Sequence, residues 1–596
     1  MFTPPKLDRP RSGRHGFPVA AILAPVPSQT RKLSRPAVVA LVAVLVLVVA
    51  GIVALEVRNV RGSAPVAGGE PVPVRIVAFN DLHGNLEPPS GSSGEVDDAA
   101  GTSVEAGGAA YLAAHVARLR AEAANTVLLS SGDNVGASPV ASALFHDEPT
   151  IEVLDALGVA ASTVGNHEFD EGSTELRRLQ DGGCHPVDGC VFRPDFDGAS
   201  FPFLGANVLD TAGAPALPTS TVVEVGGVRI GVIGVTLREL PTVVTAEAVA
   251  GLTFGDEIAA TDAASAELTA QGVAAQVLLV HQGDEGAGGG PSDCSVEPGG
   301  AGSAIARGVG ADVDAVFTAH THQQYVCAQP DPAGNPRPLV QGLSFGRLLS
   351  VLDLVVDPTT GDVVRESTTA RNEVVSRDVE PDAAVQAIVD EAVTDAAPIA
   401  DEPVGSITAD LLRSGGPSGE TPLGDVIADA QLAATRDAGA RVAITNPGGI
   451  RADLPFAPDG VVTYGEAFTV QPFGNIMQII TLTGAQLDAV LEQQWAGQSS
   501  PRILQISSTL HYSWSKAAPV GDRVTAITID GVPVDPAAPY RVAVNNFLAA
   551  GGDNFTAFAD GTDLTGAEID LDALLSYLGA NPGLAPPAQD RITVTD

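Results

Sequence analysis

Short aliphatic runs alternate with helical patterns through the first half of the chain. Residues 74–79 (Val-Arg-Ile-Val-Ala-Phe) form the first run, and others follow at 126–130, 161–164, 228–235, 277–280 and 314–318. Between several of them the apolar residues have helical spacing, as at 109–124 and 150–157. Alternating strands and helices of this kind predict a layered α/β domain.

The pattern changes near residue 365. Residues 381–396 form a helical stretch rich in Asp, Glu and Ala, and a break is expected from Ala397 and Pro398 to Pro403. A second α/β unit follows, with helical patterns at 424–438 and 484–494 and strand patterns at 441–445, 476–482, 524–529 and 541–544. We therefore expect domains at 74–365 and 404–596, joined by a linker with a connector helix at 366–403.

The N-terminal region has a different composition. Residues 1–36 carry seven basic residues and one acidic residue, and residues 37–55 are uncharged and almost wholly aliphatic. A helix of that length nearly spans a ~30 Å hydrocarbon core, and the basic flank favours a cytoplasmic N-terminus. We expect 37–55 to be an uncleaved anchor, or a signal segment cleaved near Gly62-Ser63-Ala64; a buried core helix is the remaining alternative.

Residues 56–73 would then form a tether, because this stretch is rich in small residues and proline. The bulk of the chain would lie outside the cytoplasm, either anchored to the membrane through 37–55 or secreted after cleavage. Export also fits the cysteines.

The four cysteines are Cys184, Cys190, Cys294 and Cys327. An even number in an exported chain indicates disulfides, and three pairings are open. We favour Cys184 with Cys190, because this pair closes a short loop, and Cys294 with Cys327 as the second bridge. A zinc-thiolate site is the alternative.

Overall composition limits the choice of partner. The chain has 596 residues, of which 45% are hydrophobic and 17% charged, as expected for a globular protein of two domains. Its formal net charge of -40 should repel nucleic acid, so no stable nucleic-acid partner is expected. An anionic substrate is still compatible with this charge, because bound metal ions invert the local field.

Five polar clusters follow the aliphatic runs of the first domain. They read Asn80-Asp81-Leu82-His83-Gly84, Gly132-Asp133-Asn134, Gly165-Asn166-His167-Glu168, Val280-His281 and His320-Thr321-His322. Most are weak evidence alone, since Gly-Asp is a common turn and a lone histidine at a strand end is usually structural. Gly165-Asn166-His167-Glu168 is stronger evidence, because an Asn carbonyl next to a His just after a strand is uncommon in mere packing. Five of the ten histidines nevertheless fall in these clusters, at strand ends where α/β folds place their sites.

Together the clusters supply enough Asp, Asn and His for two divalent metal ions that share a bridging carboxylate. Two metals about 3.5–4 Å apart form a phosphoester-hydrolysing centre. Such ligands suit Mn, Zn, Fe or Co and do not identify the metal.

In this order the clusters resemble the calcineurin-like metallophosphoesterase superfamily. Its pattern is Asp-x-His, Gly-Asp, Gly-Asn-His-Glu, His and Gly-His-x-His, and Ala319 stands where the last motif usually has glycine. The resemblance implies an α/β fold with a four-layer β-sandwich-type domain flanked by helices. It also implies two ligand sets: Asp81, His83, Asp133 and His322 for one metal, and Asp133, Asn166, His281 and His320 for the other.

The implied chemistry is attack of hydroxide on phosphorus, because metal coordination lowers the pKa of bound water towards neutrality. His167 follows the ligand Asn166 and need not bind metal, so it is free to stabilise the transition state or to protonate the leaving oxygen. Asp170, three residues later, would orient this imidazole. The alternative role for Asp170 is a helix N-cap.

Three stretches of the second unit point to a substrate. They are Asn446-Pro447-Gly448-Gly449-Ile450-Arg451, Gln471-Pro472-Phe473-Gly474-Asn475 and the run 546–553, which contains Phe547 and ends at Asp553. Two aromatic rings can sandwich a base, at about 1–3 kcal/mol per stacked base. Spacing alone, however, favours a core position for both rings.

Over most of its length, from about residue 72 to 590, the chain resembles the 5′-nucleotidase family. This family includes UDP-sugar hydrolases, ecto-5′-nucleotidases and 2′,3′-cyclic-nucleotide phosphodiesterases, and it has a smaller α/β C-terminal substrate-binding domain. The resemblance implies that Asn446 and Arg451 contact the substrate, that Phe473 and Phe547 clamp the base, and that Asp553 binds nearby polar groups.

One further arginine is a candidate by the same resemblance. Family members often have a substrate-binding arginine just before the segment that Glu420-Thr421-Pro422-Leu423-Gly424-Asp425 resembles. The nearest one here is Arg413, which residues 414–419 separate from that segment. A site shared by two domains also suggests hinge motion, with the hinge near 381–404.

We therefore expect an exported two-metal phosphohydrolase that acts on nucleotides or other small phosphoesters, in nucleotide catabolism. The alternatives are an extracellular 2′,3′-cyclic-nucleotide phosphodiesterase, a UDP-sugar hydrolase or a nuclease. A surface binding protein with a silent active site is the alternative from another class.

Overall fold

The computed structural model describes residues 69–98, 100–245, 247–286, 288–498 and 500–595. The expected basic region (1–36), the hydrophobic segment (37–55) and the tether up to residue 68 lie outside these ranges. Within the described ranges, no helix combines the length and the apolar character needed to cross a membrane.

Two six-stranded sheets build the first domain, in the orders β16-β15-β1-β4-β5-β6 and β13-β14-β12-β11-β9-β8. The first contains β1 (Val72–Phe79), β4 (Thr126–Ser130), β5 (Ala161–Thr163), β6 (Phe203–Leu204), β15 (Leu348–Val356) and β16 (Thr369–Val374). The second contains β8 (Ser220–Val225), β9 (Val228–Thr236), β11 (Ala275–His281), β12 (Ala315–Phe317), β13 (Gln324–Pro330) and β14 (Pro336–Gly342). The aliphatic runs predicted from the sequence therefore form the central strands.

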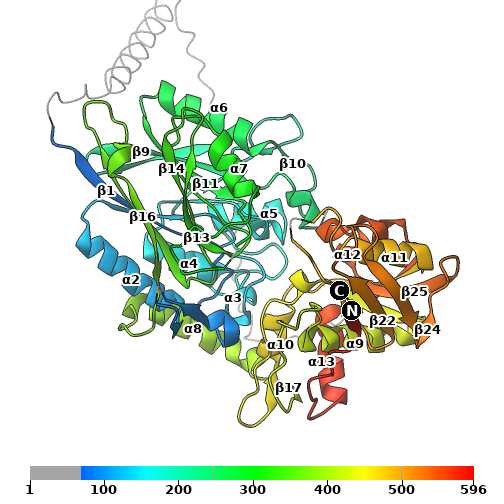
Figure 1. The fold of residues 1–596 in the computed structure, drawn as a ribbon. Coiled ribbons are helices and arrows are strands. Elements are labelled where there is room, and N and C mark those ends of the chain that lie inside the picture. Colours follow the sequence, from blue (N-terminus) through cyan, green and yellow to red (C-terminus); the bar gives the residue numbers. More distant parts are fainter. Residues whose placement is uncertain (1–68, 99, 246, 287, 499, 596) are drawn as a thin grey trace, which may run out of the picture. The chain divides into compact units, whose positions relative to one another are not determined.

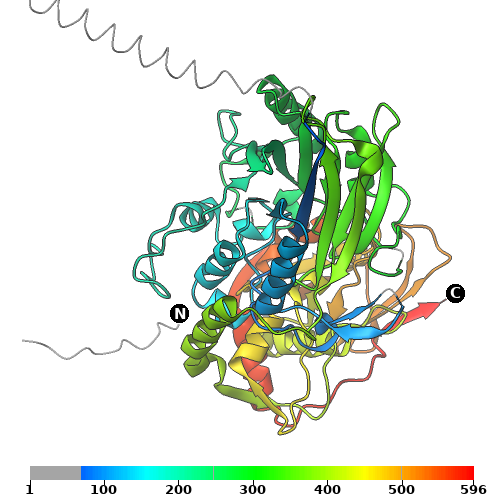
Figure 2. The ribbon, with the colours of Figure 1, turned by 90° about the vertical axis from the view of Figure 1, so that its left-hand side faces the viewer.

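The two sheets and their helices form four layers (Figures 1 and 2). Ile76 and Leu129 of the first sheet pack between the sheets with Val232 and Leu279 of the second. Helices α2 (Ala109–Glu122), α4 (Glu148–Leu157) and α8 (Ala383–Ala400) share a hydrophobic cluster with the outer face of the first sheet. Helices α6 (Glu257–Ala270) and α7 (Ala301–Gly308) cover the second. The predicted α/β class and four-layer arrangement are therefore confirmed. The central strands could be recognised in the sequence because strands buried on both faces need continuous aliphatic runs.

The connector region differs from expectation in two respects. Strand β16 pairs with β15, so the first sheet extends past the boundary expected at residue 365. Helix α8 is capped by Asp382 and runs through Pro398 to Ala400, so the break expected at Ala397 is wrong. A proline there is tolerated because it lies in the last turn, where it removes one hydrogen bond close to the helix end.

The second domain holds a five-stranded sheet, β21-β18-β25-β20-β26, and a four-stranded sheet, β24-β23-β22-β27. The five strands are β18 (Val442–Thr445), β20 (Ile476–Thr483), β21 (Gln505–Ile506), β25 (Pro539–Asn545) and β26 (Thr562–Ile569). The other sheet has β22 (Leu510–Ser515), β23 (Val524–Ile529), β24 (Val532–Pro533) and β27 (Ile592–Thr595). The two predicted helices appear as α9 (Pro422–Thr435) and α11 (Gly484–Glu492). The domain also contains helices α10 (Tyr464–Val470), α12 (Asn546–Ala549) and α13 (Asp570–Ala580), and a two-stranded sheet of β17 (Pro403–Ser406) and β19 (Val461–Thr463).

All four cysteines form disulfides. Cys184 pairs with Cys190, and Cys294 pairs with Cys327, as the sequence favoured. The zinc-thiolate alternative is therefore wrong.

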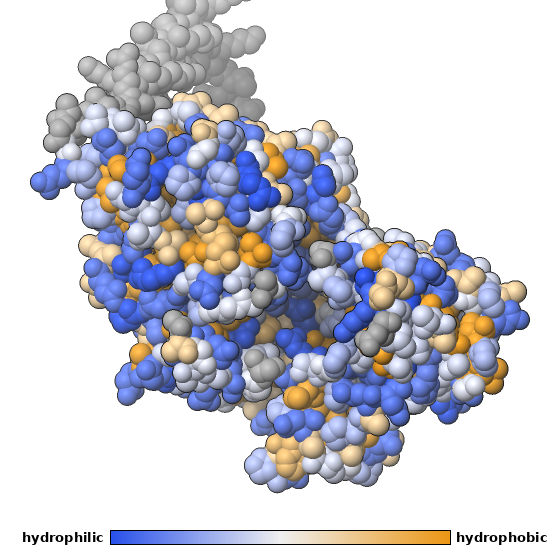
Figure 3. Space-filling view, viewed as in Figure 1, coloured by the Kyte–Doolittle hydropathy of each residue, from blue (hydrophilic) through white to orange (hydrophobic). Residues whose placement is uncertain are grey.

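On the face shown in Figure 3 the surface is mainly hydrophilic, with hydrophobic residues in scattered patches.

Candidate metal centre and substrate cavity

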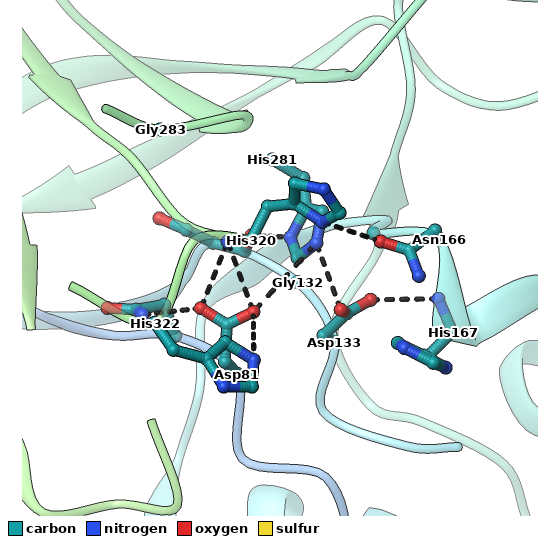
Figure 4. Close-up of polar contacts among 12 residues, drawn as sticks. Asp81, Gly132, Asp133, Asn166, His167, His281, Gly283, His320 and His322 are labelled. Carbon is teal, nitrogen blue, oxygen red and sulfur yellow. Dashed lines mark hydrogen bonds and ion pairs between the residues drawn. The ribbon is translucent and has the colours of Figure 1, made fainter. Parts of the chain in front are cut away.

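The seven side chains predicted as metal ligands come together where strands of both sheets end. Figure 4 labels Asp81, Asp133, Asn166, His281, His320 and His322. Each lies at the carboxyl end of a strand or in the loop that follows it. Asp81 and His83 follow β1, Asp133 follows β4, Asn166 follows β5, His281 ends β11, and His320 and His322 follow β12. The two facing sheets thus bring together residues that are distant in sequence.

Asp81, His83 and His322 form one group of ligand atoms. The Nε2 atoms of His83 and His322 lie 3.2 Å apart, and His322 Nε2 lies 3.5 Å from Asp81 Oδ1. His83 Nδ1 donates to the Gly136 carbonyl at 2.9 Å, so its Nε2 presents a lone pair to the group. Burial holds the pKa of both histidines well below the ordinary value, which keeps the rings neutral. The two neutral imidazoles and the Asp81 carboxylate thus face one another with their lone pairs, an arrangement that can bind a cation.

Asp133, His281 and His320 form a second group, with Asn166 beside it. His281 Nδ1 donates to the Ser131 carbonyl at 2.8 Å, which turns Nε2 towards Asp133. This buried Nε2 makes no hydrogen bond of good geometry, although Asp133 Oδ2 lies 3.0 Å away. His320 Nδ1 lies 2.9 Å from Asn166 Oδ1, and burial lowers the pKa of His320 to about 3. A divalent cation would displace the proton from His281 Nε2 and would accept lone pairs from that nitrogen and from the neutral ring of His320.

Asp133 lies between the two groups. Its Oδ2 is 3.0 Å from His281 Nε2 and 3.7 Å from His83 Nε2. Burial acts to raise the pKa of Asp133, but His281 and His167 outweigh it and hold the pKa well below the usual range. Burial likewise acts to lower the pKa of His281, but Asp133 and Asp81 raise it to about 9. An ionised carboxylate with access to both groups is what a bridging ligand requires.

The ligand loops adopt an unusual backbone conformation. The left-handed region, with φ between 48° and 73°, contains five of the predicted ligands: Asp81, His83, Asp133, His320 and His322. Such conformations cost about 1–3 kcal/mol per residue and cluster at functional sites. Gly165 is required for packing, because a Cβ there would lie 2.1 Å from Asp133 Oδ1.

Glu168 has a role that the sequence analysis did not assign. Its buried carboxylate accepts backbone N–H groups from Asp133 at 2.9 Å, Asn134 at 2.8 Å and Gly165 at 2.5 Å. It therefore fixes one ligand loop against the next. Burial raises the pKa of Glu168 to about 7. The motif Gly-Asn-His-Glu already contained this residue, but its partners became visible only in the fold.

His167 and Asp170 form the predicted dyad. His167 Nδ1 lies 2.8 Å from Asp170 Oδ2, and the His167 backbone N–H donates to Asp133 Oδ1 at 2.8 Å. Burial acts to lower the pKa of His167, but the charges of Asp170 and Asp133 outweigh it, so the net shift is upward. The alternative role of Asp170 as a helix N-cap is wrong, because the next helix, α5 (Ser173–Asp181), has Gly172 at that position.

A cavity of about 340 Å³ adjoins the metal ligands. Residues of both domains line it. From the first domain they include Asp133, Asn166, His167, Asp170, His320 and His322; from the second, Asn446, Arg451, Phe473, Arg502, Phe547 and Asp553. Phe473 and Phe547 thus face a cavity, unlike the core position that their spacing favoured.

Arg451 and Phe473 lie close to the first group of ligands. Arg451 Nη2 is 3.5 Å from His83 Nε2, and the guanidinium carbon is 5.7 Å from the centre of the Phe473 ring. The Phe473 and His167 rings are near-parallel, with centroids 5.7 Å apart. This arrangement puts a cation and an aromatic face beside the predicted metal site.

Asp553 is tied to two neighbours in the cavity. Asn446 Nδ2 donates to Asp553 Oδ2 at 2.8 Å, and Arg502 donates to Asp553 Oδ1. Asn545 Nδ2 in turn donates to Asn446 Oδ1 at 3.1 Å. The sequence analysis missed Arg502 and Asn545, since no local motif marks them.

Arg413 does not line this cavity. Its Nη1 donates to the carbonyl of Arg451 at 2.9 Å, and its backbone N–H donates to Asp453 Oδ1 at 2.8 Å. Burial lowers the pKa of Arg413. In this structure Arg413 therefore supports the loop that carries Arg451.

Comparison with known proteins agrees with this geometry. Residues 74–324 match the family model for calcineurin-like phosphoesterases, and residues 402–560 match that for the 5′-nucleotidase C-terminal domain. Endonuclease YhcR of Bacillus subtilis is 33% identical over 518 residues, which cover 85% of this chain and 40% of the relative. The chain thus spans less than half of that protein.

Two further matches cover more of the other chain. Cell wall protein Lmo0130 of Listeria monocytogenes is 33% identical over 571 residues, which are 89% of this chain and 70% of the relative. The crystal structure of a 5′-nucleotidase precursor from Thermus thermophilus superposes with a TM-score of 0.73 at 26% identity, covering 88% of this chain and all of the other. The chain therefore belongs to the calcineurin-like phosphoesterases with a 5′-nucleotidase C-terminal domain, and it is a metal-dependent phosphoester hydrolase.

Proposed function

We propose that the protein is an exported two-metal phosphohydrolase that acts on nucleotides. The observation that carries this proposal is the cavity in which candidate metal ligands meet Phe473 and Phe547. A nucleotide would use both features, because its phosphate would bind beside the metal ligands and its planar base would stack on the aromatic rings.

The proposed ligand sets are those implied by the family resemblance. Each set has four members and shares Asp133: Asp81, His83, Asp133 and His322, and Asp133, Asn166, His281 and His320. Two divalent metal ions held there would supply activated water and would neutralise phosphoryl charge. The donor chemistry is compatible with Mn, Zn, Fe or Co.

His167 is the proposed catalytic residue of the chain itself. Its Nδ1–H faces Asp170 Oδ2 at 2.8 Å, which leaves Nε2 for the substrate. At that atom the ring would hold the proton that passes to the leaving oxygen. Asp170 would position the ring and stabilise its charge.

The second domain would bind the rest of the nucleotide. Phe473 and Phe547 would stack on the base, and Arg451 would contact the phosphate beside His83. Asn446 and Asp553 would contact polar groups of the nucleoside. Arg413 would act through the Arg451 loop.

Export is supported by several independent features. Residues 37–55 have the composition of an anchor or signal segment, and the structure contains two disulfides. One relative is named a cell wall protein. The protein would therefore act outside the cytoplasm, either anchored through 37–55 or secreted.

Other phosphoesters on the same scaffold are alternatives. A relative named endonuclease favours a test of polynucleotides, while the net charge of -40 opposes binding of long ones. A 2′,3′-cyclic-nucleotide phosphodiesterase or UDP-sugar hydrolase activity would use the same residues.

Phosphate release tests the proposal. The panel is AMP, a 2′,3′-cyclic nucleotide, UDP-glucose, single-stranded DNA and p-nitrophenyl phosphate, with Mn or Zn added. AMP and p-nitrophenyl phosphate release phosphate directly. For the cyclic nucleotide, UDP-glucose and DNA, the phosphomonoester products are afterwards treated with alkaline phosphatase to release their phosphate. We expect turnover of a mononucleotide, lost in His167→Ala. Turnover of p-nitrophenyl phosphate alone would reject the nucleotide assignment.

A further inference from the structure

Arg502 lines the substrate cavity together with Arg451. It lies in the loop between α11 and β21 and forms an ion pair with Asp553. The side chain of Arg502 is 31% exposed, whereas that of Asp553 is 7% exposed. The guanidinium is therefore the more accessible member of this pair.

A hydrogen-bond network holds this guanidinium in place. Arg502 Nη1 donates to Asp553 Oδ1, and Asn446 Nδ2 donates to Asp553 Oδ2 at 2.8 Å. The backbone N–H of Arg502 donates to the Gln494 carbonyl at 2.9 Å. Gln498 Nε2 donates to the Asp553 carbonyl at 2.8 Å. Each carboxylate oxygen of Asp553 thus already accepts from the chain, and Asp553 anchors Arg502.

The other donors of the guanidinium are unused. Among the described residues, neither Nε nor Nη2 of Arg502 makes a hydrogen bond, and Asp553 is its one ion-pair partner. A guanidinium has five N–H donors and no acceptor, in a planar fork that matches a phosphate group. Unused donors on a cation that lines the cavity point to an anionic acceptor on the ligand.

The two arginines of the cavity lie beside different groups of metal ligands. Arg451 Nη2 is 3.5 Å from His83 Nε2, in the first group. Burial is the main cause of the low pKa of His320, in the second group, and the charge of Arg502 also contributes to it. The cavity therefore offers a guanidinium at each group.

We propose that Arg502 binds a second phosphoryl group that the substrate carries on its ribose. The inference rests on the proposed function, in which the reacting phosphate lies beside Arg451 and the base stacks on Phe473 and Phe547. The ribose joins these two ends, and Arg502 is held by Asp553, on the turn that follows Phe547. The preferred substrates are then nucleoside 3′,5′-bisphosphates rather than nucleoside monophosphates.

The reaction is still hydrolysis of one ester bond. One water molecule adds to the 5′ phosphorus, the bond from phosphorus to the 5′ oxygen breaks, and that oxygen takes the proton held by His167. The products are a nucleoside 3′-phosphate and inorganic phosphate. The second phosphoryl group is bound and not transferred, so its contribution is to affinity.

Competition against p-nitrophenyl phosphate measures this affinity, because only that substrate releases p-nitrophenolate. With Mn or Zn added, inhibition constants are determined for adenosine 3′,5′-bisphosphate, for ADP and for AMP. ADP is the matched control, since it is an isomer of the bisphosphate with the same number of phosphoryl groups. The wild type should bind the bisphosphate about 10–150-fold more tightly than AMP, as expected for charge-assisted hydrogen bonds, and more tightly than ADP.

Three variants test the role of Arg502. Arg502→Met should bring the ratio of the AMP constant to the bisphosphate constant close to 1, even though AMP itself is also weakened through Asp553. Arg502→Lys keeps the charge but not the planar fork, so its ratio should lie between those of Arg502→Met and the wild type. Arg441→Met, at an exposed ion pair with Asp530, should keep the wild-type ratio.

The outcomes separate this proposal from the nucleotide assignment. Inhibition by ADP that equals or exceeds that by the bisphosphate would overturn the role of Arg502 and leave the nucleotide assignment intact. A wild-type ratio in Arg502→Met would do the same. Absence of inhibition by all three nucleotides would reject the assignment and this proposal together.

Discussion

His167 Nδ1 lies 2.8 Å from Asp170 Oδ2, and the backbone of the same histidine is held by Asp133. The ring is thus oriented by one carboxylate while its main chain is fixed by the central carboxylate of the metal-ligand cluster. General acid–base catalysis contributes about 10²–10⁴-fold, so we expect His167→Ala to lower kcat on AMP, whose leaving oxygen is strongly basic, by that factor. Asp170→Asn should lower it by about tenfold.

Measurement of the bound metal distinguishes a catalytic role of His167 and Asp170 from an indirect effect through loss of metal ions. Both variants should retain the metal stoichiometry of the wild type, and the exposed substitution Asp195→Asn should retain full activity. A wild-type rate in Asp170→Asn would show that the carboxylate does not position the ring.

Phe547→Ala should weaken nucleotide hydrolysis selectively. Stacking on one base is worth about 1–3 kcal/mol, so kcat/KM for AMP should fall by about 5–150-fold. Hydrolysis of p-nitrophenyl phosphate, which has no nucleobase, should change little. Phe456→Ala is the matched control, since that ring is 42% exposed and does not line the cavity. An equal loss on both substrates would contradict base stacking.

Asp553→Asn should disturb substrate binding through its two partners. The carboxylate accepts from both Asn446 and Arg502, and an amide can accept at one position only. We expect KM for AMP to rise by about tenfold, since a lost charge-assisted hydrogen bond costs about 1.5–3 kcal/mol. Arg502→Met should give a similar rise. Arg441→Met, at an exposed pair with Asp530, should leave KM unchanged.

Glu168→Gln should weaken metal binding without removing a predicted ligand. The carboxylate accepts three backbone N–H groups from the ligand loops, whereas a glutamine offers one acceptor oxygen. Loss of such outer contacts lowers metal affinity by about 10–100-fold. Titration of the apoprotein by isothermal calorimetry measures this directly. The exposed Glu224→Gln should bind metal as the wild type does, and an unchanged affinity in Glu168→Gln would reject the supporting role.

The buried carboxyl group of Asp425 should make the folded protein less stable as the pH rises. Neither of its buried oxygens makes a hydrogen bond of good geometry, although Arg591 Nε lies 3.6 Å from Oδ1. Burial raises the pKa of Asp425 and the charge of Arg591 lowers it, but with Glu420 nearby the net result is a rise from 3.8 to about 8. Between these values the folded chain holds a proton that the unfolded chain has lost. The free energy of unfolding therefore falls with pH across this window, by up to about 1.4 kcal/mol per pH unit.

Denaturant unfolding at pH 5, 6, 7 and 8 tests this sign. Relative to wild type, Asp425→Asn should lack this one-proton slope, so the two curves should converge or cross as pH rises. The stabilisation is complete below about pH 4 and is lost above about pH 8. Parallel curves for the two proteins would show that Asp425 does not titrate in this window.

The sequence by itself determined the layered fold and the candidate metal ligands, because both depend on local patterns. Continuous aliphatic runs specify buried strands, and the polar clusters mark where those strands end, so Asp81, Asp133, His281 and His320 could be named without coordinates. Tertiary structure alone decided the rest. Glu168 tethers loops through backbone amides, Arg502 reaches Asp553, and His146 stacks on His185, each across a separation in sequence that carries no local signal. Pro398 is a case in which a local signal was misleading. The sequence predicted a break before this proline, but the packed turns of α8 that precede it continue through it to Ala400.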